Sequence, residues 1–435
     1  MLFATSGEID SFDLIIGAAL IVLLSYTFDF IAKKFSIPSV ILLIVLGMGI
    51  TWALDRFLDV ENVTGTVIPV LQVLGTVGLI LIVLEAALDL RLEKKKTKMI
   101  WMAFFVALFV LLLTVFGVAF VLVYFLEIDL LLALVYATPL SIMSSAIVIP
   151  SVGNLAELKK EFMIYEATFS DILGIILFFF LTGLDLASES MTGALFSELF
   201  RIIITIIISV IVSYGLVYFI SRITKKANFF TIFALLALFY ALGKKLHLSS
   251  LITILVFGLI LYNTKIFFKG KLENLISKDY HERIIEDFKL LTHQSAFLVR
   301  TFFFVAFGMI ISFSSGTKEG VLLIAGSALI IMYLIRFAHL KFVKAHEIMP
   351  ELFIAPRGLI TVLLFFQIPE KYKDMLTPDQ LELMDGTMFD IILVTALVMM
   401  LALIFAKKDY DVIEDITIVD ESALLGYGRD IKDLS

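Results

Sequence analysis

The segment from Phe162 to Leu184 is largely apolar, yet it contains two carboxylates, Glu166 and Asp171. A carboxylate at the centre of a bilayer costs about 2.5–3.5 kcal/mol on insertion scales, and such residues are usually retained to bind an ion, a proton or a basic partner. The two carboxylates are five residues apart, which is about 140° around a helix. They cannot share one face, so we predict separate roles: one carboxylate faces an ion and the other pairs with a buried arginine.

The composition is that of a membrane protein. Hydrophobic residues make up 60% of the 435 residues and the mean hydropathy is +1.04, whereas soluble domains are about 45–50% apolar. The absence of cysteine excludes disulfides, thiolate metal sites and thiol nucleophiles. Basic residues form no aromatic-interleaved stripe of the kind that binds nucleic acid, and neither a zinc site nor a cofactor is predicted.

Apolar runs long enough to cross a bilayer occur along the whole chain. A spanning helix needs about 17–25 such residues. We therefore predict an all-α polytopic membrane protein that forms a single integral membrane domain over residues 1–435, with about 13 transmembrane helices. Their approximate ranges are 13–32, 38–54, 66–88, 99–125, 130–150, 162–183, 199–220, 229–243, 250–268, 294–313, 319–340, 350–368 and 388–406.

Basic residues fix the predicted orientation. Of the 34 Lys and Arg residues, 24 lie in one set of alternate loops and in the C-terminal tail, and six lie on the other side. Cytoplasmic loops carry the excess of Lys and Arg, so we place the N-terminus outside and the C-terminus in the cytoplasm. The other four lie in or beside spans: Arg201, Arg300, Arg336 and Arg357.

Two further segments have their own character. Residues 269–293 place apolar side chains three or four positions apart opposite charged ones, which predicts an amphipathic linker helix on the cytoplasmic surface. The acidic tail at 407–435 is too short for a nucleotide-binding domain.

Two spans are interrupted by proline. Pro139 lies inside the span at 130–150, and Pro356, followed by Arg357, lies inside the span at 350–368. Proline removes a backbone donor and disfavours helix at the preceding residue. In lipid, such breaks persist only inside protein or beside a wet cavity. The two spans are seven apart and run in opposite directions, and paired breaks in inverted repeats are typical of a transporter site.

Oxygen atoms near the first break favour a hard cation such as Na⁺. Thr138 and Ser141, with Ser144 and Ser145, would supply hydroxyls and freed carbonyls, while Asp171 would supply the charge and Ser170 one more hydroxyl. A single carboxylate that holds either a proton or a cation, but never both, is by itself an exchanger. Asp171 is therefore the predicted Na⁺ and proton site.

The partner of Glu166 stays open at this point. Arg336 and Arg357 are both candidates, whereas Arg300 lies about two turns from the cytoplasmic end of its span and would snorkel outward. Glu85 is a secondary candidate that would line the cytoplasmic approach to the site.

Several motifs resemble those of the monovalent cation:proton antiporter family, the NhaP-like sodium/proton antiporters. The sequence EATFSD at 166–171 resembles the family's E-S-x-x-N-D motif on the sixth helix, and ATPLSIMSSAIV resembles its unwound A-T-D-P-V crossing helix. Further resemblances are LIRFAHL to the eleventh-helix arginine segment, APRGLITVL to G-L-R-G-A-V on the twelfth, and GLILIVLEAALDLRLEKKK to the segment that closes the third.

The resemblance implies the NhaA/NhaP-like fold and an elevator-like antiporter, usually a homodimer. It implies a mobile core at about 99–183 and 294–406 and dimerisation helices at about 13–88 and 199–268. Asp171 matches the ion- and proton-binding aspartate, Glu166 and Arg336 match a core ion pair, and Thr138 matches the crossing-helix threonine. Two positions depart from the family: Ser170 stands where asparagine or aspartate is usual, and Pro139 follows Thr138 directly, so the crossing-helix aspartate is missing.

We therefore predict a prokaryotic inner-membrane transporter that exchanges Na⁺, and Li⁺, for H⁺ without moving net charge. A K⁺/H⁺ antiporter or potassium-efflux transporter of the same superfamily is the alternative. That group often carries a large cytoplasmic nucleotide-binding domain, which we do not find here. An intramembrane aspartyl protease would need two aspartates that converge across helices in motifs such as Y-D and G-x-G-D, and the predicted spans contain neither motif. A receptor or scaffold has no use for paired broken helices around a carboxylate.

Overall fold

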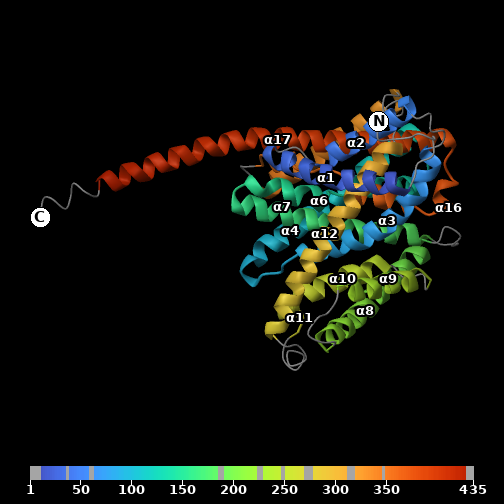
Figure 1. Cartoon of the computed structure of the whole chain (residues 1–435), viewed down its shortest axis with the longest axis horizontal. Coiled ribbons are helices and arrows are strands. Elements are labelled where there is room, and N and C mark those ends of the chain that lie inside the picture. Colours follow the sequence, from blue (N-terminus) through green and yellow to red (C-terminus); the bar gives the residue numbers. More distant parts are fainter. Residues whose placement is uncertain are drawn as a thin grey trace, which may run out of the picture.

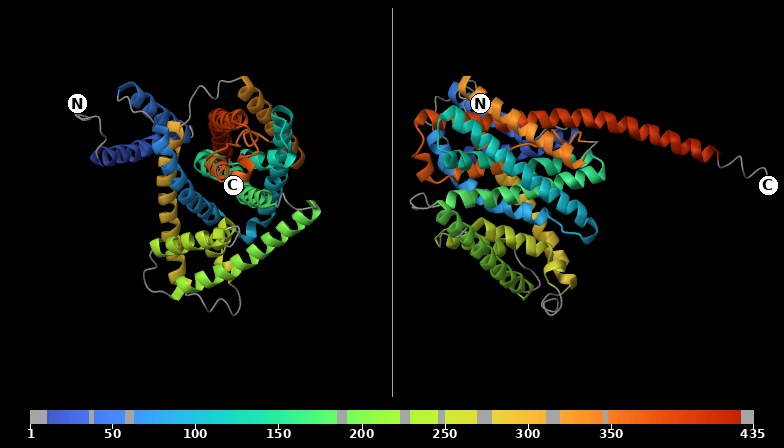
Figure 2. Two further views of the ribbon diagram at one scale, coloured as in Figure 1. Left: turned by 90° about the vertical axis from the view of Figure 1, so that its right-hand side faces the viewer. Right: turned by 180° about the vertical axis from the view of Figure 1, so that it is seen from behind.

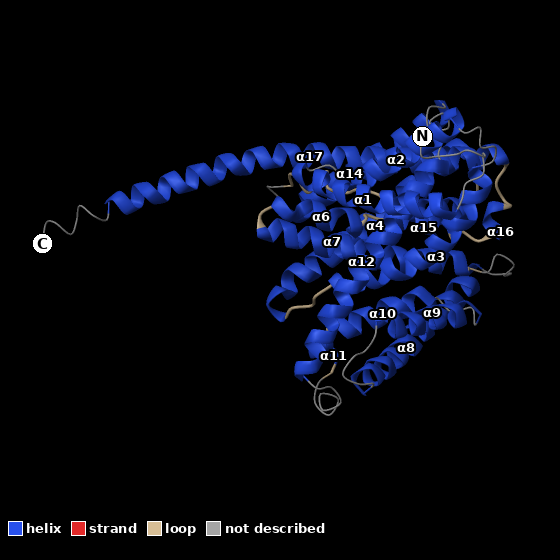
Figure 3. Cartoon of the chain, viewed as in Figure 1, coloured by secondary structure: helices blue, strands red, loops and turns tan. Residues whose placement is uncertain are grey.

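A computed structural model describes residues 11–35, 39–57, 63–184, 191–222, 229–245, 250–268, 278–310, 319–344 and 348–427. Within these ranges the regular structure is entirely helical (Figure 3). The all-α class predicted from the composition is therefore confirmed.

Long helices make up the first half of the chain. In chain order they are α1 (Ser11–Phe35), α2 (Ser39–Phe57), α3 (Val63–Asp89), α4 (Thr97–Leu126), α5 (Leu130–Ser141), α6 (Ser145–Ser151) and α7 (Glu157–Gly183), with short 3₁₀ turns at Lys94–Lys96 and Val152–Asn154. The second half contains α8 (Met191–Arg222), α9 (Phe229–Lys245), α10 (Ser250–Tyr262), α11 (Thr264–Phe267), α12 (Lys278–Ile310), α14 (Glu319–Lys344), α15 (Leu359–Phe366), α16 (Glu370–Lys373) and α17 (Pro378–Tyr427).

Each of the thirteen predicted ranges overlaps at least one helix. In the described part of the chain, eight helical segments are long and apolar enough to cross a membrane, and two shorter apolar ones lie at Ser39–Leu54 and Ser250–Tyr262. Multiple membrane-spanning helices are thus confirmed, while the number of thirteen crossings stays a prediction.

The helices form two groups. One group contains α4, α5, α6, α7, α14, α15 and α17, which pack on one another; the other contains α1, α2, α3, α8, α9, α10 and α12. In the left view of Figure 2, α17 is seen nearly end-on, and α12 and α8 lie away from it. We call these groups the core and the scaffold. They meet mainly where α3 contacts α6, α7 and α15.

Helix α12 packs along α2 and α3. It contains residues 294–310 of the span at 294–313, which was expected to belong to the mobile core; the division into a mobile core and dimerisation helices stays a prediction. Two glycines allow this close packing. A Cβ added to Gly308 would lie 2.3 Å from the carbonyl oxygen of Ile44, and one added to Gly47 would lie 2.1 Å from that of Val305. Small residues let helix backbones approach in this way in membrane proteins.

The two breaks differ in detail from those predicted. Pro139 lies inside α5, and the helix ends two residues later at Ser141, so the break falls at residues 142–144. In the second span, residues 354–358 are not helical and helix begins only at Leu359. Pro356 thus lies within a stretch of irregular chain rather than at a kink in a helix.

The predicted linker and tail are continuous with neighbouring helices. Residues 269–277 lie outside the described part of the chain, but α12 begins at Lys278 and runs without interruption through the expected boundary at 294. Helix α17 likewise begins at Pro378, before the predicted span at 388–406, and continues to Tyr427, projecting from the bundle (Figure 1).

Candidate ion-binding site

The two broken segments meet and complete each other's backbone hydrogen bonds. The N–H of Ser144, in the first break, donates to the carbonyl oxygen of Pro356, in the second, at 2.9 Å. An unpaired backbone group inside a membrane protein costs several kcal/mol. The second break therefore supplies partners that the first would otherwise lack.

Arg357 lies at the C-terminal end of α5. Its Nε donates to the carbonyl of Leu140 at 3.1 Å and its Nη2 to that of Ser141 at 3.2 Å, while Nη1 donates to Ala355 at 2.5 Å. The side chain is buried. A helix C-terminus carries partial negative charge, so the guanidinium is stabilised by the end of α5 and by carbonyl dipoles. Arg357 is not the partner of Glu166, which was one of the two sequence-based possibilities.

Asp171 lies at the N-terminus of α6, which carries partial positive charge, in contrast to the C-terminus of α5. Its Oδ2 accepts a hydrogen bond from the backbone N–H of Ser145 at 3.1 Å and another from the Ser145 hydroxyl. The residue is only 1% exposed. Its Oδ1 is buried and has no hydrogen-bond partner among the residues that the structure describes. A helix N-terminus favours an anion, and the free oxygen is a ligand position of the type that hard cations prefer.

The predicted hydroxyls are all buried at or near this break. Ser170 Oγ accepts a hydrogen bond from the N–H of Met143 at 2.9 Å, so Ser170 holds the broken segment from α7. Thr138 and Ser141 each donate to the carbonyl four residues earlier in α5, at 2.8 Å. A hydroxyl that donates in this way still has lone pairs for a cation. The structure therefore places Ser170 and Asp171 directly against the break, with Thr138 one turn before its edge.

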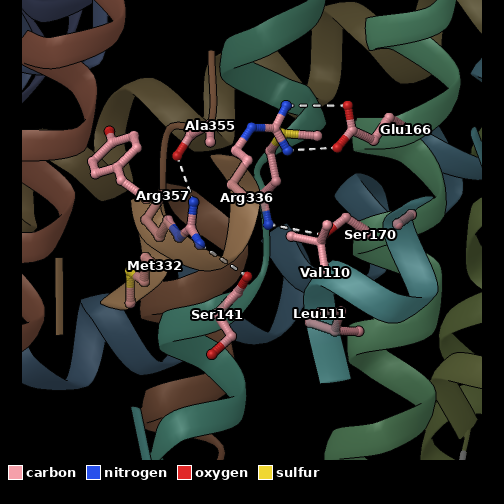
Figure 4. A pocket seen from close by; sticks show the side chains of 12 residues that line it. Val110, Leu111, Ser141, Glu166, Ser170, Met332, Arg336, Ala355 and Arg357 are labelled. Atoms are coloured by element: carbon pink, nitrogen blue, oxygen red, sulfur yellow. Dashed lines mark hydrogen bonds and ion pairs between the residues drawn. The ribbon is translucent and has the colours of Figure 1, made fainter. Parts of the chain in front are cut away.

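Glu166 pairs with Arg336, as the family resemblance implied. Nη1 and Nη2 of Arg336 lie 2.5 Å and 3.1 Å from the two carboxylate oxygens (Figure 4). The other donors of the guanidinium reach carbonyls of the irregular segment before α15, namely those of Glu351, Leu352 and Ile354. Both side chains are buried. Beside them is a cavity of about 10 Å³, enough for one water molecule.

A large cavity leads from one end of the bundle to the Asp171 site. Its volume is about 570 Å³, and it is lined by residues of α1, α2, α3, α6 and α12. Ser145, which holds Asp171, lies on its wall together with Glu85. Ser151 and Gly153 also line it, so it extends to the C-terminal end of α6, which is the predicted cytoplasmic side.

A charged network crosses this cavity between α3 and α12. His293 contacts Glu85 at 2.8 Å and Asp89 at 3.1 Å, and Arg300 lies 2.8 Å from the second oxygen of Glu85. Lys289 lies 3.0 Å from Asp89. The sequence prediction had Arg300 snorkelling outward, but it faces inward because Glu85 supplies a partner there. His293 was not singled out because residues 269–293 were read as a surface helix.

Within the described residues, no group of three or more His, Asp or Glu side chains is arranged to hold a metal ion.

Comparisons with known proteins agree with this architecture. A family model described as "Sodium/hydrogen exchanger, transmembrane" matches residues 19–407. Among curated protein sequences, none matches this chain. A solved structure of the sodium proton antiporter MjNhaP1 from Methanocaldococcus jannaschii at pH 8 is similar, with a TM-score of 0.67 and 20% sequence identity over 89% of this chain and 95% of that one. An electron-microscopy structure of the same antiporter gives 0.61 and 20%, over 92% and 96%. At this level of identity the likeness establishes the fold.

Proposed function

Because this chain belongs to the sodium/hydrogen exchanger family, whose members are membrane transporters rather than enzymes, we propose that it exchanges Na⁺, or Li⁺, for H⁺ at Asp171. The main observation that supports this proposal is the position of the Asp171 carboxylate. It is buried at the N-terminus of α6, beside the wall of a 570 Å³ cavity, and one of its oxygens has no partner among the described residues.

Competition between a proton and a cation explains the exchange. When Asp171 is ionised, its free oxygen can bind a cation that has shed part of its water, with Ser170 and the hydroxyls of α5 as further oxygen ligands. When the carboxyl group is protonated, it no longer attracts a cation. The loaded site therefore holds one or the other, so movement of one ion down its gradient can drive the other ion in the opposite direction.

We propose that the core carries Asp171 past the scaffold in an elevator-like movement. All residues of the two breaks belong to the core, so they can move together, whereas α3 and α12 of the scaffold form the facing wall. The scaffold would also form the homodimer interface. The cavity opens toward the predicted cytoplasmic side, so this conformation would be inward-facing, with the N-terminus outside a prokaryotic cell membrane.

Electroneutral exchange follows from the neighbours of Asp171. Ser170 carries no charge where an acidic residue would add a second titrating group. Glu166 is paired with the buried guanidinium of Arg336. Asp171 is thus the one carboxylate left to exchange a proton for a cation in each cycle.

The test is proton flux in proteoliposomes with Na⁺, Li⁺ and K⁺ supplied separately, with and without a membrane potential. Asp171→Asn should abolish cation-dependent flux, because asparagine neither releases a proton nor attracts a cation. Glu157→Gln, at the exposed start of the same helix, is the matched control and should retain flux. Cation-dependent flux in purified Asp171→Asn would refute the assignment, and stronger stimulation by K⁺ than by Na⁺ would identify a K⁺/H⁺ antiporter.

A further inference from the structure

The C-terminal end of α7, which carries Asp171, is in contact with a buried carboxylate of the scaffold. Glu198 of α8 lies against Gly183, the last residue of α7. A Cβ added to Gly183 would lie 2.1 Å from Oε1 of Glu198 and 2.5 Å from its Cδ. Only glycine leaves room for this carboxylate, so the two helices fit together here without any spacing side chain.

Arg201 joins the same contact from the scaffold. Its Nη2 lies 2.7 Å from Oε2 of Glu198 and donates to the carbonyl of Gly183 at 3.4 Å. A carboxylate at a helix C-terminus is unfavourable by itself, because both are negative. Arg201 offsets this repulsion by binding both groups at once.

Two neighbouring carbonyls at this end of α7 are bound instead by the short helix α16, which precedes α17 in the chain. Lys371, in α16, donates to Leu184 at 3.2 Å, and the hydroxyl of Tyr372 donates to Leu181 at 3.1 Å. Helix α16 lies between α15 and α17 in the chain, at the end of the bundle opposite to that from which α17 projects (Figure 1). In the proposed movement these two donors would travel with α7, whereas Glu198 and Arg201 would stay with the scaffold. Lys371 also attracts the Glu198 carboxylate across this boundary, so this attraction and the contacts of Glu198 and Arg201 with Gly183 would be lost when core and scaffold slide.

We infer that Glu198 and Arg201 form a latch that stabilises the conformation whose cavity opens at the C-terminal end of α6. Gly183 follows Asp171 by twelve residues on one helix, or about 18 Å at 1.5 Å per residue. The latch therefore contacts the C-terminal end of α7, the helix that carries Asp171. This inference depends on the proposed movement of the core, but not on which cation is carried.

The absence of cysteine makes the test direct. Spin labels on Leu158→Cys, on the exposed start of α7, and Leu290→Cys, on the exposed part of α12, would report the core–scaffold distance by pulsed electron resonance in reconstituted full-length protein. Glu198→Gln and Arg201→Gln should each change the ratio of the two distance populations about threefold or more, toward the conformation without the latch, as expected for loss of one hydrogen bond across the boundary, that from Arg201, which Glu198 positions, to Gly183. Ser197→Ala, whose hydroxyl bonds only within α8, is the control and should leave the ratio unchanged.

The outcomes separate the latch from the transport proposal. Unchanged distance distributions in both variants, or a single distance in every protein, would overturn the latch. A changed ratio in a protein that shows no cation-dependent flux would support the latch while refuting the proposed exchange. If Glu198→Gln does not fold, Arg201→Gln alone decides, since this side chain is 41% exposed and its replacement buries no new group.

Discussion

Removal of Arg336 should destabilise the core more than removal of any exposed arginine. Arg336→Ala would leave the Glu166 carboxylate buried without a counter-charge, because both side chains are at most 3% exposed. Breaking a buried pair by removing one partner typically costs about 3–5 kcal/mol. The same change also removes the donor to three carbonyls before α15, so we expect the upper half of this range.

The stranded charge, rather than the lost packing, should account for most of the effect. The charge-free double variant Glu166→Gln/Arg336→Leu should therefore be more stable than the sum of the two single variants predicts, by about 2 kcal/mol, since contacting residues couple by 0.5–3 kcal/mol. Arg336→Lys should be intermediate, because lysine keeps the charge but lacks the planar fork that binds both carboxylate oxygens.

The assay is urea unfolding of the purified protein in detergent, with the free energy of unfolding compared between variants. Arg91→Ala is the matched control, because Arg91 pairs with Glu93 at 3.2 Å but its side chain is 66% exposed; it should change stability by less than about 1 kcal/mol. Single-variant effects that add within about 0.5 kcal/mol would show that Glu166 and Arg336 do not act as a pair, and this reasoning would then be wrong.

Three further outcomes follow from the site and the scaffold. Ser170→Asp should make exchange respond to an imposed membrane potential, because a second carboxylate would join the break. Currents on a solid-supported membrane measure this response. Currents that already scale with turnover in the native protein would contradict electroneutral exchange. Arg357→Ala should lower the free energy of unfolding by about 2–3 kcal/mol in the same assay, because carbonyls at the end of α5 lose their donor. Arg357→Lys should recover only part of this loss. Equal stability of the native protein and both variants would refute the capping role. Gly308→Ala should cost about 1–3 kcal/mol through overpacking against Ile44, whereas Gly326→Ala, with open space around it, should cost less than about 1 kcal/mol.

The sequence predicted the polar core better than the path of the chain. Glu166 and Arg336 lie 170 residues apart, so no local sequence pattern indicates that they pair. The pairing was predicted from the family motifs. The position of the first break was missed by three residues, because Pro139 is accommodated inside α5 while the helix ends where Ser170, Arg357 and Pro356 provide partners for its backbone. Those partners come from distant segments and cannot be read from the proline itself.

The network at Glu85 was only partly predictable for a similar reason. Glu85 and Asp89 are four residues apart and so share one face of α3, which is a signal in the sequence. Their basic partners lie on α12, about 200 residues later. Because the linker was predicted to end at residue 293, His293 was expected on the surface. Helix α12 instead runs continuously from Lys278, and His293 lines the cavity.

The bond between Ser144 and Pro356 gives the protein an order of assembly. The donor of Ser144 and the carbonyls of Leu140 and Ser141 find their partners only in residues 356 and 357, more than 200 positions later. During synthesis these groups reach the bilayer well before the residues that satisfy them. The first break therefore lacks these backbone partners until more than four-fifths of the chain has been made, and a chain truncated before Pro356 would leave the N–H of Ser144 and the carbonyls of Leu140 and Ser141 without them.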